Sequence, residues 1–250
     1  MLPGGIFSLI NKSIANLLKV VLPDICLFCQ EMEGLKKYCV CKKCWYSFKF
    51  INQIPHCKFC GKRSKKMEVC ISCSFFRPDC DDLLSVFSYQ DKIAKAIKLL
   101  KFGDKTFFAK FAAQIIADNF KDQIDDADFI IPVPIHRVRL FFRKYNQSTL
   151  IANHISKLFD KPIKHNFIKR KKYTKPQARL NLDMRRINLY NAFELNDNLR
   201  DIKVKIKNAK VIIIDDVITT GATAFGCAKL LKFCGAKSIT AISLARSILN

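Results

Sequence analysis

The sequence predicts an α/β fold, in which an open parallel sheet is flanked by helices and preceded by a small cysteine-rich module. Strand-like and helix-like stretches alternate from residue 81 onward, which is typical of sheets wound by right-handed crossovers. Ten of the twelve cysteines lie before Asp81, mostly in repeated C-x-x-C pairs. Residues 1–24 have the apolar spacing of an amphipathic helix ending at Pro23-Asp24. We therefore expect three regions, at residues 1–24, 25–80 and 81–250.

Within the α/β region, each element has its own pattern. Val211–Ile214 is a continuous β-branched run, as expected of a strand buried on both faces. Further strands are expected at Leu83–Tyr89, Asp128–Pro134, Pro162–Ile168 and Ser238–Leu244. Apolar residues at helical spacing predict helices at Asp91–Phe102, Thr106–Phe120, Gln147–Phe159 and Ala222–Cys234, the last stopped by Gly235. Lys169–Arg186 is a basic stretch with the weak pattern of a loop.

The charge balance predicts attraction to polyanions. The net charge is +23 and the pI about 9.7, which favours nucleic acid, an anionic membrane or phosphorylated metabolites as partners. A lysine-enriching genome would give the same charge without any such partner. No apolar run approaches the roughly 18–20 residues of a membrane span, and residues 1–23 lack the pattern of a secretory signal. A cytoplasmic protein is expected, in which the N-terminal apolar face packs on the protein's own core or contacts a membrane surface.

The segment from Val211 to Ala224 has the pattern of a phosphate-binding site. A buried strand leads into Asp215 and Asp216, then into a turn with three threonines and Gly221, then into a helix. Ligands of open α/β sheets bind at the carboxyl ends of strands, and a helix start presents N–H groups and a positive dipole end to phosphate. Gly221 permits a positive φ or a close backbone approach. The two carboxylates are suited to accept hydrogen bonds from sugar hydroxyls or to hold a metal-bound water. A plain strand, turn and helix without ligand is the alternative.

The cysteine pairs predict two structural zinc sites of four thiolates each. Zinc prefers four soft ligands in a tetrahedron, and two C-x-x-C turns supply them. The expected ligands are Cys26, Cys29, Cys41, Cys44, Cys57, Cys60, Cys70 and Cys73. Three alternatives stay open: Cys39 in place of Cys41, interleaved pairs, and disulfides or free structural thiols. Cys80, Cys227 and Cys234 are expected to be unliganded.

Lysines and aromatic residues are interleaved in the cysteine-rich region. Lysines suit phosphates and aromatic rings suit unstacked bases, as in proteins that bind single-stranded nucleic acid. Packing of the ribbons is the other interpretation of these rings, which are Tyr38, Trp45, Tyr46, Phe48, Phe50 and Phe59.

The string from Val211 to Ala224 resembles the phosphoribosyl pyrophosphate signature of type I phosphoribosyltransferases. The resemblance implies that Asp215 and Asp216 contact the ribose. It further implies that the 5′-phosphate is bound by Thr219, Thr220, Gly221, Ala222 and Thr223. Magnesium would accompany the pyrophosphate.

Weaker strings extend the resemblance to the ComF family of competence-associated proteins, which join a zinc ribbon to a phosphoribosyltransferase-like domain. It covers roughly Cys26 to Arg246. Arg143, Asn146 and Gln147 match a family motif, in which Lys144 replaces a glycine. By resemblance, Pro132–Arg137 is the loop on the pyrophosphate side and Arg170–Arg186 the mobile loop over the site. Lys98 and Lys101 match a helix that often carries a lysine.

Three functions follow from these observations. The first is a ComF-like protein that binds phosphoribosyl pyrophosphate and single-stranded DNA during natural transformation, with a DNA-translocation helicase as a further partner. The second is an active phosphoribosyltransferase, in which Arg137, Arg143 and Arg170 stabilise leaving pyrophosphate with Mg²⁺. The third is a structural adaptor whose basic face contacts a membrane surface or the helicase.

Overall fold

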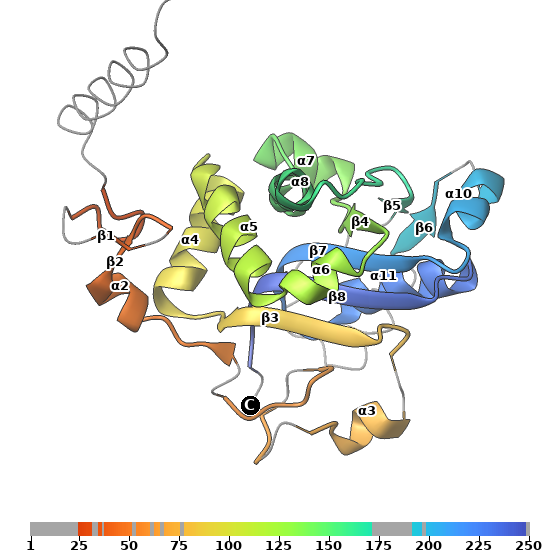
Figure 1. The fold of residues 1–250 in the computed structure, drawn as a ribbon, viewed down its shortest axis with the longest axis horizontal. Helices are drawn as coiled ribbons and strands as arrows, with labels where there is room; N and C mark the ends of the chain where they lie inside the picture. Colours follow the sequence, from red (N-terminus) through yellow and green to blue (C-terminus); the bar gives the residue numbers. More distant parts are fainter. Residues whose placement is uncertain are drawn as a thin grey trace, which may run out of the picture. The chain divides into compact units, whose positions relative to one another are not determined.

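The computed structural model describes residues 25–31, 35–36, 38–51, 54–60, 63–65, 68–75, 78–171, 192–196 and 199–248. The helix predicted within residues 1–24 and most of the loop predicted at 169–186 lie outside these ranges. Contacts divide the chain into two compact units, Met1–Phe48 and Lys49–Asn250 (Figure 1). The boundaries that composition suggests at residues 24 and 80 stay a prediction.

The smaller unit is a short hairpin followed by one helical turn. Strands β1 (Leu35–Lys36) and β2 (Val40–Cys41) are antiparallel, and α2 (Lys42–Tyr46) follows directly. Tyr38 and Cys39 between the strands both have positive φ, at 78° and 55°. A module of this size has little apolar core, so metal ligands are expected to supply much of its stability.

The larger unit contains a four-stranded parallel sheet in the order β3-β8-β7-β4. The strands are β3 (Asp82–Ser88), β4 (Phe129–Pro132), β7 (Lys210–Ile218) and β8 (Ser238–Arg246). All four were expected from the apolar runs, and with the helices beside them they confirm the predicted fold class. The strand expected at Pro162–Ile168 is wrong for all but its last residue, because Ile163 makes one parallel bridge to Ile130, the chain then turns, and only Ile168 lies in a strand.

Helices lie on both faces of this sheet (Figure 1). On one face are α5 (Phe107–Asn119) and α8 (Gln147–Phe159), which pack on the strands through their buried apolar residues. The other face carries α11 (Ala222–Phe233). The remaining helices are α3 (Ile71–Phe75), α4 (Asp91–Phe102), α6 (Lys121–Asp125), α7 (Arg137–Arg143) and α10 (Leu199–Ile206). A short antiparallel pair, β5 (Ile168–Arg170) and β6 (Phe193–Leu195), completes the unit.

Alternate side chains along β7 join a core cluster on one face of the sheet. Val211 and Ile213 belong to a cluster with α11, which also contains Cys57, Cys60 and Cys73. The second cysteine-rich segment therefore packs into the core beneath the sheet and belongs structurally to the larger unit. In the part of the chain that the structure describes, no helix has the length and apolar character needed to cross a membrane.

Candidate functional site

A cavity opens where β4 ends and β7 continues. Pro132 at the end of β4 pairs with Ile214, and the next hydrogen bond runs from Val133 N to Ile214 O at 2.9 Å. Beyond Ile214, β7 keeps β8 as its neighbour, with Asp215 paired to Ser243. The edge of β7 that carries the two acids is therefore open on the β4 side, at the carboxyl ends of the strands, where ligands of such sheets bind.

The cavity measures about 160 Å³. Its lining combines both acids with basic and polar side chains from four stretches of the chain. The lining residues are Lys101, Val133, Pro134, Ile135, Arg139, Arg143, Asn146, Gln147, Ser148, Arg170, Asp215, Asp216, Val217 and Thr223.

The two carboxylates have different partners. Asp215 Oδ1 accepts hydrogen bonds from Ser148 Oγ at 3.0 Å and from the Asp216 amide at 2.8 Å. Asp216 Oδ2 lies 2.9 Å from Lys101 Nζ, and both side chains are largely buried. Burial, followed by the charge of Asp216, raises the pKa of Asp215 to about 7. The pair therefore sits in an environment that disfavours two uncompensated negative charges.

Arginines on two segments give the cavity its positive character. Arg143 stacks over the Phe102 ring at 4.9 Å and donates to Gln147 Oε1 at 3.3 Å. Arg170 lies over the Phe193 ring at 5.3 Å. Burial lowers the pKa of both Arg143 and Arg170, although Asp215 opposes the shift in each case. Both guanidinium groups are held partly out of water beside the acids, which strengthens their attraction for an anionic ligand.

The predicted phosphate loop begins α11 with the geometry expected of Gly221, whose φ is +78°. A Cβ there would also lie 2.6 Å from the ring of Phe225, so both backbone and packing require glycine. Of the predicted phosphate ligands, Thr223 lines the cavity. Thr219 is exposed, whereas Thr220, Gly221 and Ala222 are buried beside it at the helix start.

The three arginines proposed for catalysis separate in the structure. Arg143 and Arg170 line the cavity, whereas Arg137 is exposed and is not among the lining residues. Arg139, two residues after Arg137 in α7, lines the cavity and was not predicted from the sequence. The signal for it was its spacing of four residues from Arg143, which places both on one side of a helix.

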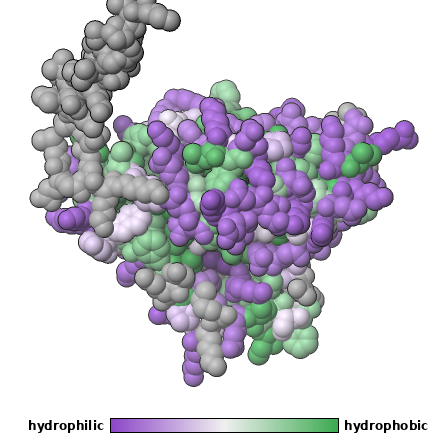
Figure 2. All heavy atoms as spheres, in the orientation of Figure 1, coloured by the Kyte–Doolittle hydropathy of each residue, from purple (hydrophilic) through white to green (hydrophobic). Residues whose placement is uncertain are grey.

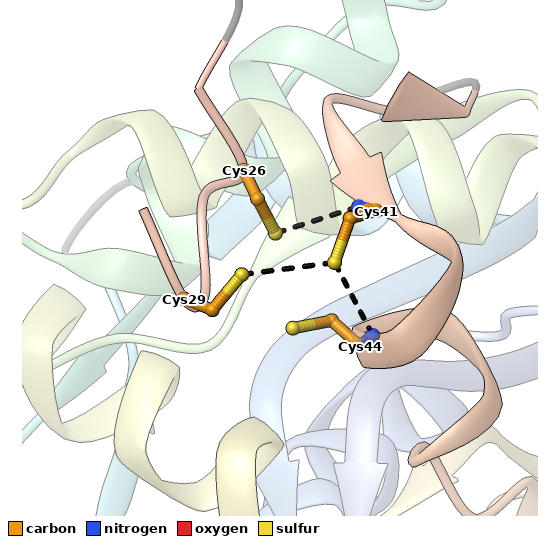
Figure 3. Close-up of side chains that lie close together, drawn as sticks. All are labelled: Cys26, Cys29, Cys41 and Cys44. Carbon is orange, nitrogen blue, oxygen red and sulfur yellow. Dashed lines mark hydrogen bonds between the residues drawn. The ribbon is translucent and has the colours of Figure 1, made fainter. Parts of the chain in front are cut away.

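The first cysteine set comprises Cys26, Cys29, Cys41 and Cys44, whose sulfur atoms all lie within 4.8 Å of one another (Figure 3). Cys29 Sγ and Cys41 Sγ are 3.6 Å apart, close to the roughly 3.8 Å expected for thiolates around tetrahedral zinc. Amides of Cys41 and Cys44 donate to Cys26 Sγ and Cys41 Sγ, each at 3.4 Å. Burial opposes ionisation, but backbone donors outweigh it and lower the pKa of Cys26 to about 6. Cys39 is exposed and lies outside the set.

The second set, Cys57, Cys60, Cys70 and Cys73, has the same compactness, with Cys60 Sγ and Cys70 Sγ 3.6 Å apart. The first pair thus joins the second and the third joins the fourth, without interleaving. All twelve cysteines lie in the described part of the chain, and none of them forms a disulfide. Both sets therefore fit structural zinc, and in each set all four ligands come from the protein.

A buried arginine reaches the second set from the end of β8. Arg246 is 1% exposed and donates to the carbonyl oxygens of Lys58, at 2.8 Å, and Phe59. Burial lowers the pKa of Arg246 to about 10, while the neighbouring thiols of Cys60 and Cys57 oppose this shift. The same strand end contacts the start of the phosphate loop, because Ser247 N donates to Ile218 O at 2.9 Å. The end of β8 thus contacts both the second cysteine set and β7, the strand that carries the two acids of the candidate site.

Comparisons with known proteins agree with this architecture. The double zinc ribbon domain model matches residues 17–74. Competence protein F of Haemophilus influenzae is 30% identical over 228 residues, which are 89% of this chain and 96% of that protein. The DNA utilization protein YhgH of Salmonella typhimurium is 25% identical over 235 residues, covering 92% of this chain and all of that protein. The amidophosphoribosyltransferase of H. influenzae is 30% identical over 135 residues, covering 54% of this chain and 23% of that enzyme. With a double zinc ribbon and a phosphoribosyltransferase-like sheet in one chain, and similarity to competence protein F along nearly its whole length, this protein belongs to the ComF family.

Proposed function

We propose that the cavity at the end of β7 binds phosphoribosyl pyrophosphate. The observation that carries the proposal is the convergence of two carboxylates and four cationic side chains around one cavity at the carboxyl edge of a parallel sheet. The acids would accept hydrogen bonds from the ribose hydroxyls. The start of α11 offers N–H groups and its dipole end to the 5′-phosphate. Lys101, Arg139, Arg143 and Arg170 are the groups that would meet the pyrophosphate.

The ion pair between Lys101 and Asp216 gives this site a resting state. Each group is neutralised by the other while no ligand is bound, which limits the cost of holding a buried carboxylate. A ribose hydroxyl replaces Lys101 at the carboxylate when ligand enters, and the ammonium becomes available to a phosphate oxygen. Mg²⁺ would arrive on the pyrophosphate oxygens and reduce the charge that the four cations must balance.

Calorimetric titration of phosphoribosyl pyrophosphate with Mg²⁺ tests this site. Asp216→Asn removes one charged acceptor and should weaken binding by about 10- to 150-fold, the equivalent of a hydrogen bond to a charged group at about 1.5–3 kcal/mol. Asp122→Asn, an exposed carboxylate in the first turn of α6, is the matched control and should bind as the wild type does. Equal affinity of the Asp216 and Asp122 variants would reject the assignment.

We further propose that the protein acts in DNA uptake, in the cytoplasm, and binds single-stranded DNA there. Relatives named for competence and for DNA utilization support this role, as does the net charge of +23. Phosphoribosyl pyrophosphate would then act as a regulator, and a DNA-translocation helicase is the expected protein partner. Salt-sensitive binding of a labelled oligonucleotide, measured with and without phosphoribosyl pyrophosphate, tests the DNA role. If the wild-type protein has no affinity for the oligonucleotide at low salt, the proposed DNA role is wrong.

Transferase activity is the second candidate, supported by the similarity to an amidophosphoribosyltransferase. In that reaction the bond from the sugar C1 to pyrophosphate breaks, the pyrophosphate leaves with the electron pair, and an acceptor nitrogen bonds to C1. Arg143 and Arg170 border the cavity where the leaving charge would develop. Release of pyrophosphate on incubation with bases, ammonia or glutamine would support catalysis, and silence across that panel would count against it.

A further inference from the structure

Helix α7 has two chemically distinct sides. Arg139 and Arg143, four residues apart, line the cavity. Phe141 and Phe142 are instead 83% and 77% exposed, with their rings 5.7 Å apart and nearly perpendicular. None of the residues of α7 is buried, so its aromatic side chains contribute nothing to the core. Two adjacent exposed phenylalanines are costly to leave in water, which points to a ligand for this face.

The end of α4 adds to the same surface. Lys95, Lys98 and Phe102 are exposed and spaced by three and four residues, so they form one stripe along α4. Arg143 stacks on the Phe102 ring at 4.9 Å, which joins the stripe to α7. Two further contacts hold the helices together, from Tyr145 Oη to Leu100 O at 2.9 Å and from Lys144 Nζ to Asp104 Oδ2 at 2.7 Å.

We call the result the basic–aromatic surface and define it by Lys95, Lys98, Phe102, Arg137, Phe141 and Phe142, all of which are exposed. Figure 2 shows hydrophobic residues set among hydrophilic ones along the upper part of the view, where Figure 1 places α4 and α7. Along α4 two cations precede a ring, and along α7 Arg137 lies one turn before Phe141.

We propose that this basic–aromatic surface is where single-stranded DNA binds, with bases stacked on the phenylalanines and phosphates paired with the lysines and Arg137. This inference rests on the DNA role proposed above and gives it a location. Single-strand sites combine a positive track with aromatic platforms, and stacking tolerates any sequence because every base has a π-face. The surface also borders the cavity, since Phe102 follows Lys101 directly and Phe142 precedes Arg143. Bound ligand and bound DNA would therefore act on the same two helices.

The arrangement favours a nucleic acid over a lipid surface. A helix that lies on a membrane segregates its apolar residues to one face and its charges to the other. Here two lysines share one stripe of α4 with the Phe102 ring, and on α7 the exposed Arg137 lies one turn before Phe141. A polyanion with exposed rings matches such a mixed surface in both charge and chemistry.

The test uses fluorescence anisotropy of a labelled oligothymidylate with the full-length zinc-loaded protein. Alanine at both Phe141 and Phe142 should weaken binding at least tenfold, because loss of a stacking ring costs about 1–3 kcal/mol per base. Glutamine at Lys95 and Lys98 should instead make the negative slope of log K against log salt shallower by about 1.4, at about 0.7 per phosphate contact. Phe233→Ala is the matched control, since Phe233 is also exposed and lies beneath a lysine, Lys203.

The outcomes separate the location from the function. If the wild type binds the oligonucleotide and the surface variants bind equally well, the location is wrong and the DNA role survives. A wild type without affinity would overturn both. Loss of sedimentation with vesicles of phosphatidylserine and phosphatidylcholine, with oligonucleotide binding unchanged, would assign the surface to lipid and overturn the proposal. Calorimetry with phosphoribosyl pyrophosphate should give wild-type affinity in the phenylalanine variant, which confirms that it is folded.

Discussion

Replacing Arg246 by methionine probes how the second zinc ribbon is attached to the sheet. Zinc with four thiolates carries a net charge of −2, and burying that charge requires compensation. Arg246 is the buried cation beside Cys57, Cys60 and Cys73, and its guanidinium bonds two carbonyl groups of the Cys57–Cys60 turn. Among the described residues, Arg246 Nε has no hydrogen-bond partner, and no carboxylate is bound at that nitrogen to neutralise the guanidinium charge.

The structure sets the size of the effect. Hydrogen bonds from a charged donor contribute about 1.5–3 kcal/mol each, and the carbonyls of Lys58 and Phe59 would both lose one. Removing one partner of a buried charged pair typically costs about 3–5 kcal/mol. We expect Arg246→Met to lower the free energy of unfolding of the larger unit by about 3–5 kcal/mol. At about 2–4 °C per kcal/mol for a domain of this size, Tm should fall by roughly 6–20 °C.

Two measurements check this expectation. Thermal unfolding reports the stability, and transfer of zinc to a chromophoric chelator reports each metal site. One equivalent of zinc should leave Arg246→Met faster than it leaves the wild type. The other equivalent, from Cys26, Cys29, Cys41 and Cys44, is the internal control and should leave at an unchanged rate. Arg246→Lys keeps the positive charge but loses the two-pronged guanidinium, so its Tm and its rate of zinc release should lie between those of the wild type and of Arg246→Met. Unchanged Tm together with unchanged release of both equivalents would refute the argument.

Two further predictions concern the candidate site at the end of β7. Gly221→Ala should destabilise the protein by more than Gly235→Ala. Both positions have positive φ, but a Cβ at Gly221 would lie 2.6 Å from the buried ring of Phe225, whereas the nearest atom to a Cβ at Gly235 is 3.7 Å away. Denaturant titration measures both losses of stability, and equal losses would contradict the prediction by showing that the Phe225 ring moves aside. The contribution of Asp215 to the free energy of unfolding should fall as pH rises from about 4 through 7. Its pKa is raised from 3.8 to about 7 in the folded protein, which therefore holds a proton that the unfolded chain releases. Asp215→Asn should flatten this slope, and parallel curves for variant and wild type between pH 5 and 8 would contradict the assignment.

The features that could be predicted best from the sequence were those with a repeated local pattern, namely two helices and the cysteine pairs. Helix α4 begins and ends where its apolar spacing predicts, and α8 does so as well, with Asn146 Oδ1 accepting from Ser148 N at its start. The cysteine pairs predicted both metal sets, because C-x-x-C spacing fixes two ligands within one turn of chain. In each case the determining contacts lie within a few residues of one another.

Strand β7 shows what local pattern cannot provide. The β-branched run ends at Ile214, and two aspartates normally end a strand prediction. The strand nevertheless runs to Ile218, because β8 continues to pair with it up to Arg246. Pairing with a strand distant in sequence thus outweighed the low strand propensity of the acids and held them in extended backbone at the cavity edge.

Helix α7 was missed for the opposite reason. Its sequence, from Arg137 to Arg143, alternates charge and apolar residues without a buried stripe, since no side chain in it reaches the core. Arg139 was missed with it, although the spacing to Arg143 is helical. A helix that is held by its ends and by contacts to α4 leaves little periodic signal, and such elements are frequently those that serve a ligand rather than the core.

The candidate site depends on tertiary order more than on any single motif. Lys101 lies at the end of α4 and Asp216 in β7, more than a hundred residues apart, yet their side chains meet at 2.9 Å. The aspartates and Gly221 could be identified because one contiguous string contains them, whereas Lys101 and Arg139 acquire their role only once the sheet order β3-β8-β7-β4 brings α4 and α7 beside the end of β7. Lys101→Met should therefore weaken the binding of phosphoribosyl pyrophosphate. It should also raise the pKa of Asp215 further, because the charge of Lys101 opposes the upward shift that burial and Asp216 cause. A binding deficit that grows as the pH falls towards 7 in Lys101→Met, but not in Arg143→Met, distinguishes this electrostatic effect from simple loss of positive charge.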